Sequence, residues 1–503
     1  MTEPSQPYSN LLHRSREIGL IDSASQLLSW DQETYMPPDS LTFRAEQLAH
    51  LGGWTHRLFT KPEVGDWINA CEDHGFPADS DEVANVREWR RAYDRKTKVP
   101  AELVEELQRA QAFAREAWME ARQKSEFPIF QPHLEKLLQL SLRMADCWGY
   151  EQSRYDALLE SYEPGARTVA LKTLFSELRP VIAELGRIAG ERSARLPADM
   201  LRGQYPIAAQ QAFNREVAEA LSFDFKAGRI DTTAHPFCSG IGPGDCRLTT
   251  RYNEADFTES LYGILHEAGH GMYEQGLRRE AHGTPLGSAA SLGIHESQSR
   301  LWENHVGRSR TFWEHWLPRA AKYFPELTRF SPEEVHASVN RVEPSFIRVE
   351  ADEVTYDLHI ILRFEIETRL IEGTLKVADV PHVWNEEFEK LMGLKVPNDA
   401  LGCLQDIHWS FGSFGYFPTY MLGNLNASQL FHRATADLPD LQSQLGHGDY
   451  SSMLGWLRSK VHQHGQRFEP LQLMRSATGE ATQARYHLDY LRVKFGKVRD
   501  LAS

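Results

Sequence analysis

The stretch 257–275, FTESLYGILHEAGHGMYEQ, decides the interpretation of this sequence. Its apolar residues recur every three or four positions on a wide face, which predicts a largely buried helix. Asp256 stands where an N-cap is expected, and Gly276 is a plausible C-terminal stop. The helix contains His266-Glu267-Ala268-Gly269-His270, an HExxH motif. Two histidines four residues apart project from one face of a helix and can hold one divalent metal ion.

The polar residues of this motif need partners inside a buried helix. An unpaired polar group in an apolar interior costs about 2 kcal/mol or more. A metal ion with its water would satisfy His266 and His270, and Glu267 is placed to deprotonate that water. The alternative is a pair of core histidines that are hydrogen-bonded within the protein.

A catalytic zinc site needs a third protein ligand and an open position for water. The extended pattern HExxHxxGxxH is excluded, because Tyr273 and Gly276 occupy its last two positions. The segment 291–308, SLGIHESQSRLWENHVGR, supplies Glu296 as the expected third ligand. Glu303 stays open as a competitor, since it lies two turns further along the same helical face.

The groups that orient the two motif histidines are not evident from the sequence. Some related metallopeptidases place an Asp four residues after the ligating Glu, but this chain has Arg300 there. Another carboxylate or carbonyl must therefore hold the second ring nitrogen of His266 and His270. We expect His295 to be a hydrogen-bonding neighbour of the site or a solvated residue rather than a fourth ligand.

Six short motifs follow one another in the sequence. They are His235-Pro236-Phe237, Asp245-Cys246-Arg247-Leu248-Thr249 (DxRxT), HEAGH at 266–270, His295-Glu296-Ser297-Gln298, the IRxxAD motif at 347–352, and the GxxQDxHW motif at 402–409. Trp30-Asp31-Gln32 and Met36-Pro37-Pro38 precede them. With these motifs in this order, the chain resembles the carboxypeptidase Taq family of metallocarboxypeptidases over nearly its whole length.

The resemblance implies an enzyme that releases single amino acids from peptide C-termini, with broad specificity. It implies one Zn²⁺ per subunit, with Co²⁺ or Mn²⁺ as alternatives, and a homodimer. The implied fold is mainly α, a large helical body with a deep substrate groove and a small β-sheet near the metal, similar to neurolysin-like or ACE-like metallopeptidases. His266, His270 and Glu296 match the family's metal ligands, Glu267 its general base, and Arg348 the residue that binds the substrate's terminal carboxylate.

The role of Arg348 also agrees with its chemistry. A planar guanidinium offers two parallel hydrogen bonds to a carboxylate, and a free carboxylate distinguishes a peptide terminus from an internal segment. The alternative for Arg348 is an internal salt bridge, for example with Glu350 or Asp352.

Further residues are predicted to stabilise the oxyanion that forms during hydrolysis. His408 and Tyr420 carry groups that can donate to a negative oxygen. The segment FGSFGYFPTY, which holds Tyr416 and Tyr420, could equally be a structural loop packed on the core.

Two more residues are predicted to bind substrate. Arg247 could shape the wall of the groove or simply pair with Asp245. His235 could donate to the bound peptide or, because it precedes a proline, serve a local turn.

The pattern along the 503 residues favours one domain, 1–503, with two lobes flanking a groove, because no Pro/Gly/Ser-rich linker or repeat divides it. Helical spacing predicts helices over 101–127 and from beyond Arg348 to near Gly373. The segment 247–253, RLTTRYN, is predicted to form a strand ahead of the metal helix, which would put Arg247 beside the site.

Composition limits the partners of this chain. A net charge of −15 argues against nucleic-acid binding, and no run of 18 apolar residues could span a membrane. The first ten residues lack a charged and then apolar signal segment. Five cysteines without metal-type spacing suit a reducing compartment, so we expect a cytoplasmic protein.

Two rival functions remain open at this stage. The first is an endo-acting oligopeptidase, whose groove is open at both ends and has no arginine to bind a substrate terminus. The second is a non-catalytic helical binding protein that keeps the fold. The intact HExxH motif argues against the second rival, because a degenerate site tends to lose its base.

Overall fold

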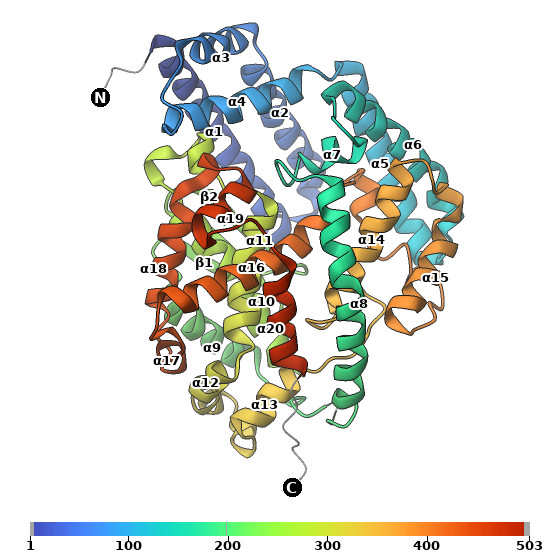
Figure 1. Ribbon diagram of the computed structural model, residues 1–503, viewed down its shortest axis with the longest axis vertical. Helices are drawn as coiled ribbons and strands as arrows, with labels where there is room; N and C mark the ends of the chain where they lie inside the picture. The colour runs from blue at the N-terminus through green and yellow to red at the C-terminus, as the bar shows by residue number, and fades with distance from the viewer. Residues whose placement is uncertain (1–4, 198, 497–503) are drawn as a thin grey trace. The chain divides into compact units, whose positions relative to one another are not determined.

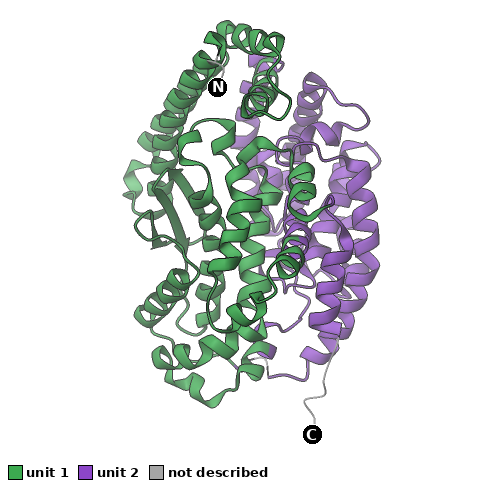
Figure 2. Cartoon of the chain, turned by 60° about the vertical axis from the view of Figure 1, so that its left-hand side comes forward, with its two compact units in different colours: residues 1–97, 201–336, 430–479 green, residues 98–200, 337–429, 480–503 purple. Residues whose placement is uncertain are grey.

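The structure is a computed structural model that describes residues 5–197 and 199–496. The chain divides into two compact units, coloured separately in Figure 2. Unit 1 comprises residues 1–97, 201–336 and 430–479, and unit 2 comprises residues 98–200, 337–429 and 480–503. The predicted mainly α class is confirmed, since the only sheet of the described residues has three short strands. The single domain with lobes flanking a groove stays a prediction.

Unit 1 contains the sheet and the predicted metal helix (Figure 1). Its first helices share a core that includes Leu11, Ile68 and Trp89. The elements that lie wholly in it, apart from single 3₁₀ turns, are α1 (Gln6–Thr34), α2 (Leu41–Phe59), α3 (Pro62–His74), α4 (Asp81–Thr97), α9 (Ile207–Ala220), β1 (Gly228–Thr232), β2 (Cys238–Gly242), β3 (Asp245–Thr250), α10 (Phe257–Gly276), α11 (Leu292–Arg300), the π-helix η4 (Leu301–Gly307), α12 (Arg310–Tyr323), α17 (Leu441–Gly446), α18 (Ser451–Lys460) and α19 (Pro470–Thr478).

The helix α10 confirms the predicted metal helix. The Asp256 carboxylate caps its start by accepting from the backbone N–H of Thr258 at 2.9 Å. Gly276, predicted as the stop, is instead the last helical residue, and a side chain there would collide with the ring of His462. Close packing, rather than helix termination, therefore requires this glycine.

The sheet has the order β1-β3-β2, with β1 parallel and β2 antiparallel to β3. The predicted strand is confirmed as β3, although it runs from Asp245 to Thr250. Successive side chains of a strand point to opposite faces. Cys246 and Leu248 face α10, where the bare backbone of Gly271 leaves room for Leu248. This contact fixes the sheet on one side of the metal helix.

α10 and α11 approach each other at Gly269. A Cβ atom on Gly269 would lie 2.6 Å from both the Gln298 carbonyl oxygen and the Ser299 Cα atom. Ser291 caps α11, and the helix continues directly into η4, a π-helix of the kind that often occurs at functional sites. The backbone contact at Gly269 brings the two predicted ligand segments together.

Unit 2 is built from long helices around one apolar core that includes Trp118, Leu178, Leu362 and Trp384. Its elements are α5 (Ala101–Lys124), α6 (Phe127–Trp148), α7 (Arg154–Leu159), α8 (Thr168–Ser193), the 3₁₀ turn η6 (Arg348–Glu350), α14 (Tyr356–Ile371), the 3₁₀ turn η7 (Val377–Asp379), α15 (Val380–Met392), the 3₁₀ turn η8 (His408–Phe411), α20 (Ala484–Leu491) and the π-helix η10 (Arg492–Gly496). Two further helices, α13 (Pro332–Val339) and α16 (Pro418–Asp437), continue from one unit into the other.

The two helices predicted in unit 2 exist, with one boundary corrected. α14 ends at Ile371, close to the predicted Gly373. The predicted helix 101–127 is too long, because α5 ends at Lys124 and Ser125 adopts a left-handed φ of 57° before α6 begins at Phe127.

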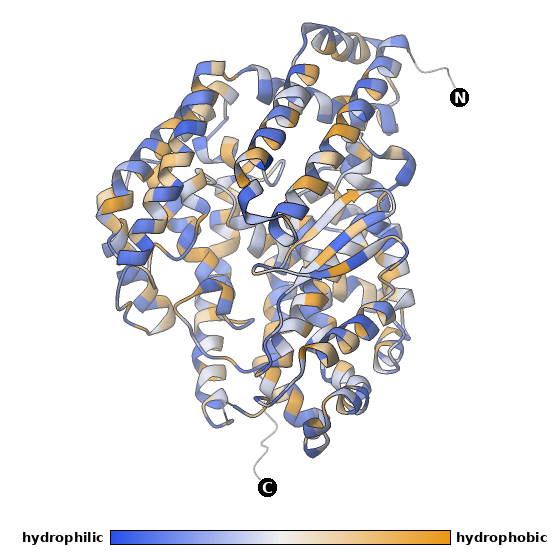
Figure 3. Cartoon of the chain, turned by 180° about the vertical axis from the view of Figure 1, so that it is seen from behind, coloured by the Kyte–Doolittle hydropathy of each residue, from blue (hydrophilic) through white to orange (hydrophobic). Residues whose placement is uncertain are grey.

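Polar and apolar residues alternate along the helices of Figure 3. Among the described residues, no helix is long and apolar enough to cross a membrane.

We expect Gly269→Ala to lower the free energy of unfolding by about 1–3 kcal/mol, because the added methyl group would force α10 away from α11. Gly455→Ala on α18 is the matched control, since nothing lies within 4 Å of its Cβ position. That substitution should be neutral or stabilise by up to about 1 kcal/mol. Denaturant unfolding of both variants measures the difference, and equal stabilities would contradict the close approach.

Candidate functional site

His266, His270 and Glu296 form one cluster in unit 1. One ligand atom from each lies within 4.8 Å of the other two. The Oε2 atom of Glu296 is 3.8 Å from His266 Nε2 and 3.6 Å from His270 Nε2. A tetrahedral ion with bonds of about 2.0–2.1 Å separates its ligand atoms by about 3.4 Å. The donor set and its spacing therefore fit one divalent ion.

The outer nitrogens of the two imidazoles have different partners. His266 Nδ1 lies 2.9 Å from Glu303 Oε2, and His270 Nδ1 lies 2.5 Å from His295 Nδ1. The competitor Glu303 is thus bonded to the ring nitrogen that faces away from Glu296, which suits an orienting carboxylate rather than a ligand. These contacts supply the orienting groups that the sequence did not reveal.

Arg300 is also hydrogen-bonded within this cluster. Its Nε donates to Glu296 Oε1 at 2.7 Å, and Arg308 donates to Glu303 Oε1 at 3.1 Å. Burial would raise the pKa of Glu296, but Arg300 and the two histidines outweigh it and hold that pKa well below its usual range. Glu296 is therefore held as a carboxylate, the form that binds a metal.

Burial shifts His270 and Glu267 toward their neutral forms, whereas for His266 the nearby carboxylates of Glu296 and Glu303 outweigh burial and raise the pKa. Burial lowers the pKa of His270 to about 4, with help from the neighbouring His295. A neutral imidazole keeps the lone pair that a metal ion needs. Burial raises the pKa of Glu267 to about 7, so this carboxyl group can accept and release a proton near neutral pH.

A second cluster lies in unit 2 around Arg348, whose surface is only 5% exposed. Its Nε and one terminal nitrogen donate to Asp406 Oδ1 at 3.1 and 2.8 Å, and the other donates to the Tyr356 hydroxyl at 2.9 Å. Arg363, fully buried, donates to the other oxygen of Asp406 at 2.7 Å. An internal salt bridge of Arg348 thus exists, but its partner is Asp406 rather than Glu350 or Asp352.

His408 and Tyr420 lie beside this arginine within unit 2. His408 Nε2 is 3.3 Å from the Tyr420 hydroxyl, and the Tyr420 ring centroid is 4.8 Å from the Arg348 guanidinium. Burial lowers the pKa of His408 to about 4, so its imidazole is neutral at pH 7. Tyr420 stands in the first turn of α16 and Tyr416 in the turn before it. Both side chains are half-buried. This partial exposure agrees with a role in binding the oxyanion and equally with a structural role in the loop.

Comparison with known proteins identifies the family. A family model described as carboxypeptidase Taq (M32) metallopeptidase matches residues 10–495. The chain belongs to the M32 family. It is therefore a metallocarboxypeptidase, a peptide hydrolase that depends on a divalent metal.

Relatives of this M32 protein match it from end to end. It is 44% identical to thermostable carboxypeptidase 1 of Thermus thermophilus, over 98% of this chain and 99% of that one. It is 36% identical to carboxypeptidase 1 of Bacillus subtilis, over 96% and 97% of the two chains. The crystal structure of an M32 carboxypeptidase from Deinococcus radiodurans R1 is similar with a TM-score of 0.95 and 37% identity, covering 98% of this chain and 99% of that one.

The remaining predicted residues of the M32 chain lie elsewhere in unit 1. His235 is exposed in the loop between β1 and β2. The alternation of β3 turns Arg247 to the opposite face from Cys246 and Leu248, and its place beside the site stays a prediction. On that face Arg247 pairs with Asp245 through two 2.8 Å bonds, and its guanidinium lies 4.2 Å from the ring centroid of Trp30 on α1.

Sequence analysis missed four residues that are hydrogen-bonded in or next to the two clusters of this metallopeptidase, among them Glu274, whose Oε1 lies 2.8 Å from His295 Nε2. Asp406 stands inside the GxxQDxHW motif and Glu274 follows His270 by four residues, so motif position and helical spacing could have found both. Arg363 carried no comparable signal, because its contact with Asp406 joins distant segments, and Tyr356, eight residues after Arg348, stands in no motif that points to this contact.

We expect removal of each of the two glutamates near the proposed metal site to lower the metal affinity of this M32 protein to a different extent. Glu296→Ala should abolish tight binding of Zn²⁺ or Co²⁺, whereas Glu303→Ala should weaken it by about 10- to 100-fold, the usual effect of removing an orienting partner. Competition with a chromophoric chelator measures both. Glu314→Ala is the control, because Glu314 is an exposed residue that pairs with the exposed Arg310 on the same helix, α12. A greater loss in Glu303→Ala than in Glu296→Ala would contradict the assignment.

Proposed function

We propose that this protein releases single amino acids from the C-termini of peptides with broad specificity, through a Zn²⁺ ion held by His266, His270 and Glu296. The spacing of these three ligand atoms, all within 4.8 Å, carries the proposal. Two imidazoles and one carboxylate suit zinc, and Co²⁺ or Mn²⁺ can occupy the same ligands. The peptidase relatives with end-to-end similarity support this reaction.

Glu267 is the proposed general base and acid. A bound divalent ion would polarise the scissile carbonyl and make water a stronger nucleophile. Glu267 takes the proton of the attacking water and then delivers it to the nitrogen of the leaving amino acid. Its burial, with a pKa raised to about 7, supports both transfers.

Arg348 is the proposed binding group for the substrate's terminal carboxylate. A guanidinium has five N–H donors, and the bonds to Asp406 and Tyr356 use three of them. These bonds leave one N–H on each terminal nitrogen for a further acceptor, and two such donors can bind a carboxylate. Arg348 and Arg363 share the single carboxylate of Asp406, and a buried surplus of positive charge is costly until an anion balances it.

His408 and Tyr420 are the proposed donors to the oxyanion, supported by their contact with each other and by the place of Tyr420 beside Arg348. His235 is proposed to contact the peptide, since its side chain is exposed. Arg247 is held by Asp245 and Trp30, and we propose that it mainly stabilises the sheet.

We further propose a homodimer in the cytoplasm. The dimer rests on the family resemblance, and sedimentation of the purified protein tests it. The compartment is supported by five cysteines that are all free thiols, as expected where the environment is reducing.

Two peptides that differ only at the C-terminus distinguish the exopeptidase from the endo-acting alternative. Mass spectrometry should show stepwise loss of single residues from the free acid, no loss from its amidated twin, and no cleavage after chelation. Arg348→Lys should lower kcat/KM on the free acid by about 10- to 150-fold, because a hydrogen bond to a charged group contributes about 1.5–3 kcal/mol. Internal cleavage of both peptides would establish the oligopeptidase instead.

The matched control for this arginine is Arg187→Lys on α8, an exposed residue of the same unit that pairs with Glu184 and Glu191. Its kcat/KM should equal that of the wild type. If Arg348→Lys lowered kcat/KM by the same factor for internal and for C-terminal peptide bonds, that result would count against a role in carboxylate binding.

Glu267→Gln separates catalysis from metal binding. The amide cannot take a proton from water, so kcat should fall by about 10²- to 10⁴-fold while one metal ion per subunit stays bound. Metal content and turnover are measured on the same sample. A variant that keeps its turnover would remove Glu267 from the mechanism.

A further inference from the structure

The two motif histidines are held in different ways. The Nδ1 atom of His266 bonds directly to the carboxylate of Glu303, whereas the Nδ1 atom of His270 meets a second imidazole, that of His295. His295 Nδ1 lies 2.5 Å from His270 Nδ1, and His295 Nε2 lies 2.8 Å from Glu274 Oε1. The rings of His270 and His295 also face each other, with centroids 4.5 Å apart. A continuous chain of hydrogen bonds therefore leads from His270 to Glu274.

We propose that Glu274 is a positioning residue of the metal centre, acting on His270 through His295; this rests on the proposed metal ligands. A carboxylate accepts, so His295 must donate from Nε2 and keep Nδ1 free of a proton. His295 Nδ1 then accepts from His270 Nδ1–H. His270 is left with its Nε2 lone pair directed to the side of Glu296, as metal binding requires.

Glu274 is held in turn by the edge strand of the sheet. A Cβ atom on Gly240 of β2 would collide with Glu274 Oε2 and lie 2.8 Å from its Cδ. Gly240 pairs with Cys246 of β3, which itself contacts α10 at Gly271. The bare backbone of Gly240 therefore provides the space in which the carboxylate meets His295. This gives the small sheet a direct part in shaping the metal centre.

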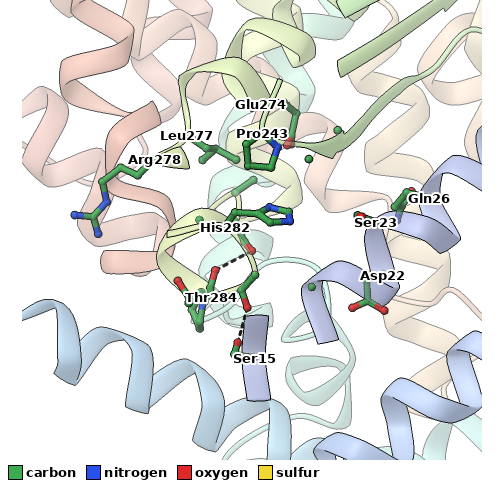
Figure 4. A pocket seen from close by; sticks show the side chains of 18 of the residues that line it. Ser15, Asp22, Ser23, Gln26, Pro243, Glu274, Leu277, Arg278, His282 and Thr284 are labelled. Atoms are coloured by element: carbon green, nitrogen blue, oxygen red, sulfur yellow. Dashed lines mark hydrogen bonds between the residues drawn. The ribbon is translucent and has the colours of Figure 1, made fainter. Parts of the chain in front are cut away.

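The Glu274 side chain also lines a cavity of about 460 Å³ within unit 1. Figure 4 shows it in the wall of that cavity, near Pro243 and on the same side as His282. A small molecule from solvent can therefore approach the place of this carboxylate. This access makes chemical rescue possible: acetate or formate could replace a carboxylate that a mutation has removed.

The test is a competition titration of Co²⁺ against metal-free protein with a chromophoric chelator. Glu274→Ala should raise the dissociation constant about 10- to 100-fold, and acetate should recover part of that loss without improving the wild type. Gly240→Ala should also weaken binding, because its methyl group displaces the carboxylate. Gly242→Ala is the control on the same strand, since its Cβ would meet the His282 ring at an ordinary 3.6 Å.

The outcomes distinguish this inference from the proposed metal site. If wild-type protein binds no tight ion, the metal site fails. If the wild type binds one ion and Glu274→Ala binds it equally well, only the positioning role fails. A weakened Glu274→Ala that acetate does not restore, with Gly240→Ala unchanged, would assign Glu274 a purely structural role and overturn the inference. Circular dichroism and the melting point of each metal-free variant check the fold, and Glu274→Gln serves as a variant of conserved shape.

Discussion

The contact between α10 and α11 at Gly269 is the constraint on which the metal centre depends. Because residue 269 has no side chain, the two backbones meet, and Glu296 comes within 3.8 Å of both motif histidines. The result is a largely buried group of polar side chains in which the Nε2 atoms of both histidines lie near one oxygen of Glu296. Arg300 keeps Glu296 charged, and burial keeps His270 neutral. For these two residues, helix packing thus favours the protonation states in which a side chain binds a divalent ion.

Each unit holds its own preorganised cluster of polar side chains. Unit 1 contains the proposed metal ligands, the proposed base and the carboxylates bonded near the imidazoles. Unit 2 supplies a guanidinium whose direction is set by Asp406 and Tyr356 before any substrate arrives. Groups that are already oriented lose little entropy on binding, so the binding energy is available for the reaction. The shared use of Asp406 by Arg348 and Arg363 also leaves a charge that suits an anionic substrate terminus.

Local patterns in the sequence predicted the elements of the site better than the contacts between them. Helical periodicity located α10 and α14, and the motif spacing selected Glu296 as the third member of the cluster. The sequence could not show that Glu303 meets the outer nitrogen of His266, because that depends on how η4 packs on α10. It also could not show which face of β3 carries Arg247, since a strand's alternation says which residues share a face but not which face a helix covers. The break at Ser125 was missed because a left-handed serine has no distinctive sequence pattern.

The central claim is that one ion binds to His266, His270 and Glu296 while Glu303 and His295 hold the outer ring nitrogens. Anomalous diffraction from crystals grown with Zn²⁺, recorded at the zinc edge, tests it most directly. The account predicts one peak per subunit, about 2.0–2.2 Å from the two Nε2 atoms and a Glu296 oxygen. A peak at Nδ1 of either histidine or on Glu303, or no peak in the cluster, would contradict it.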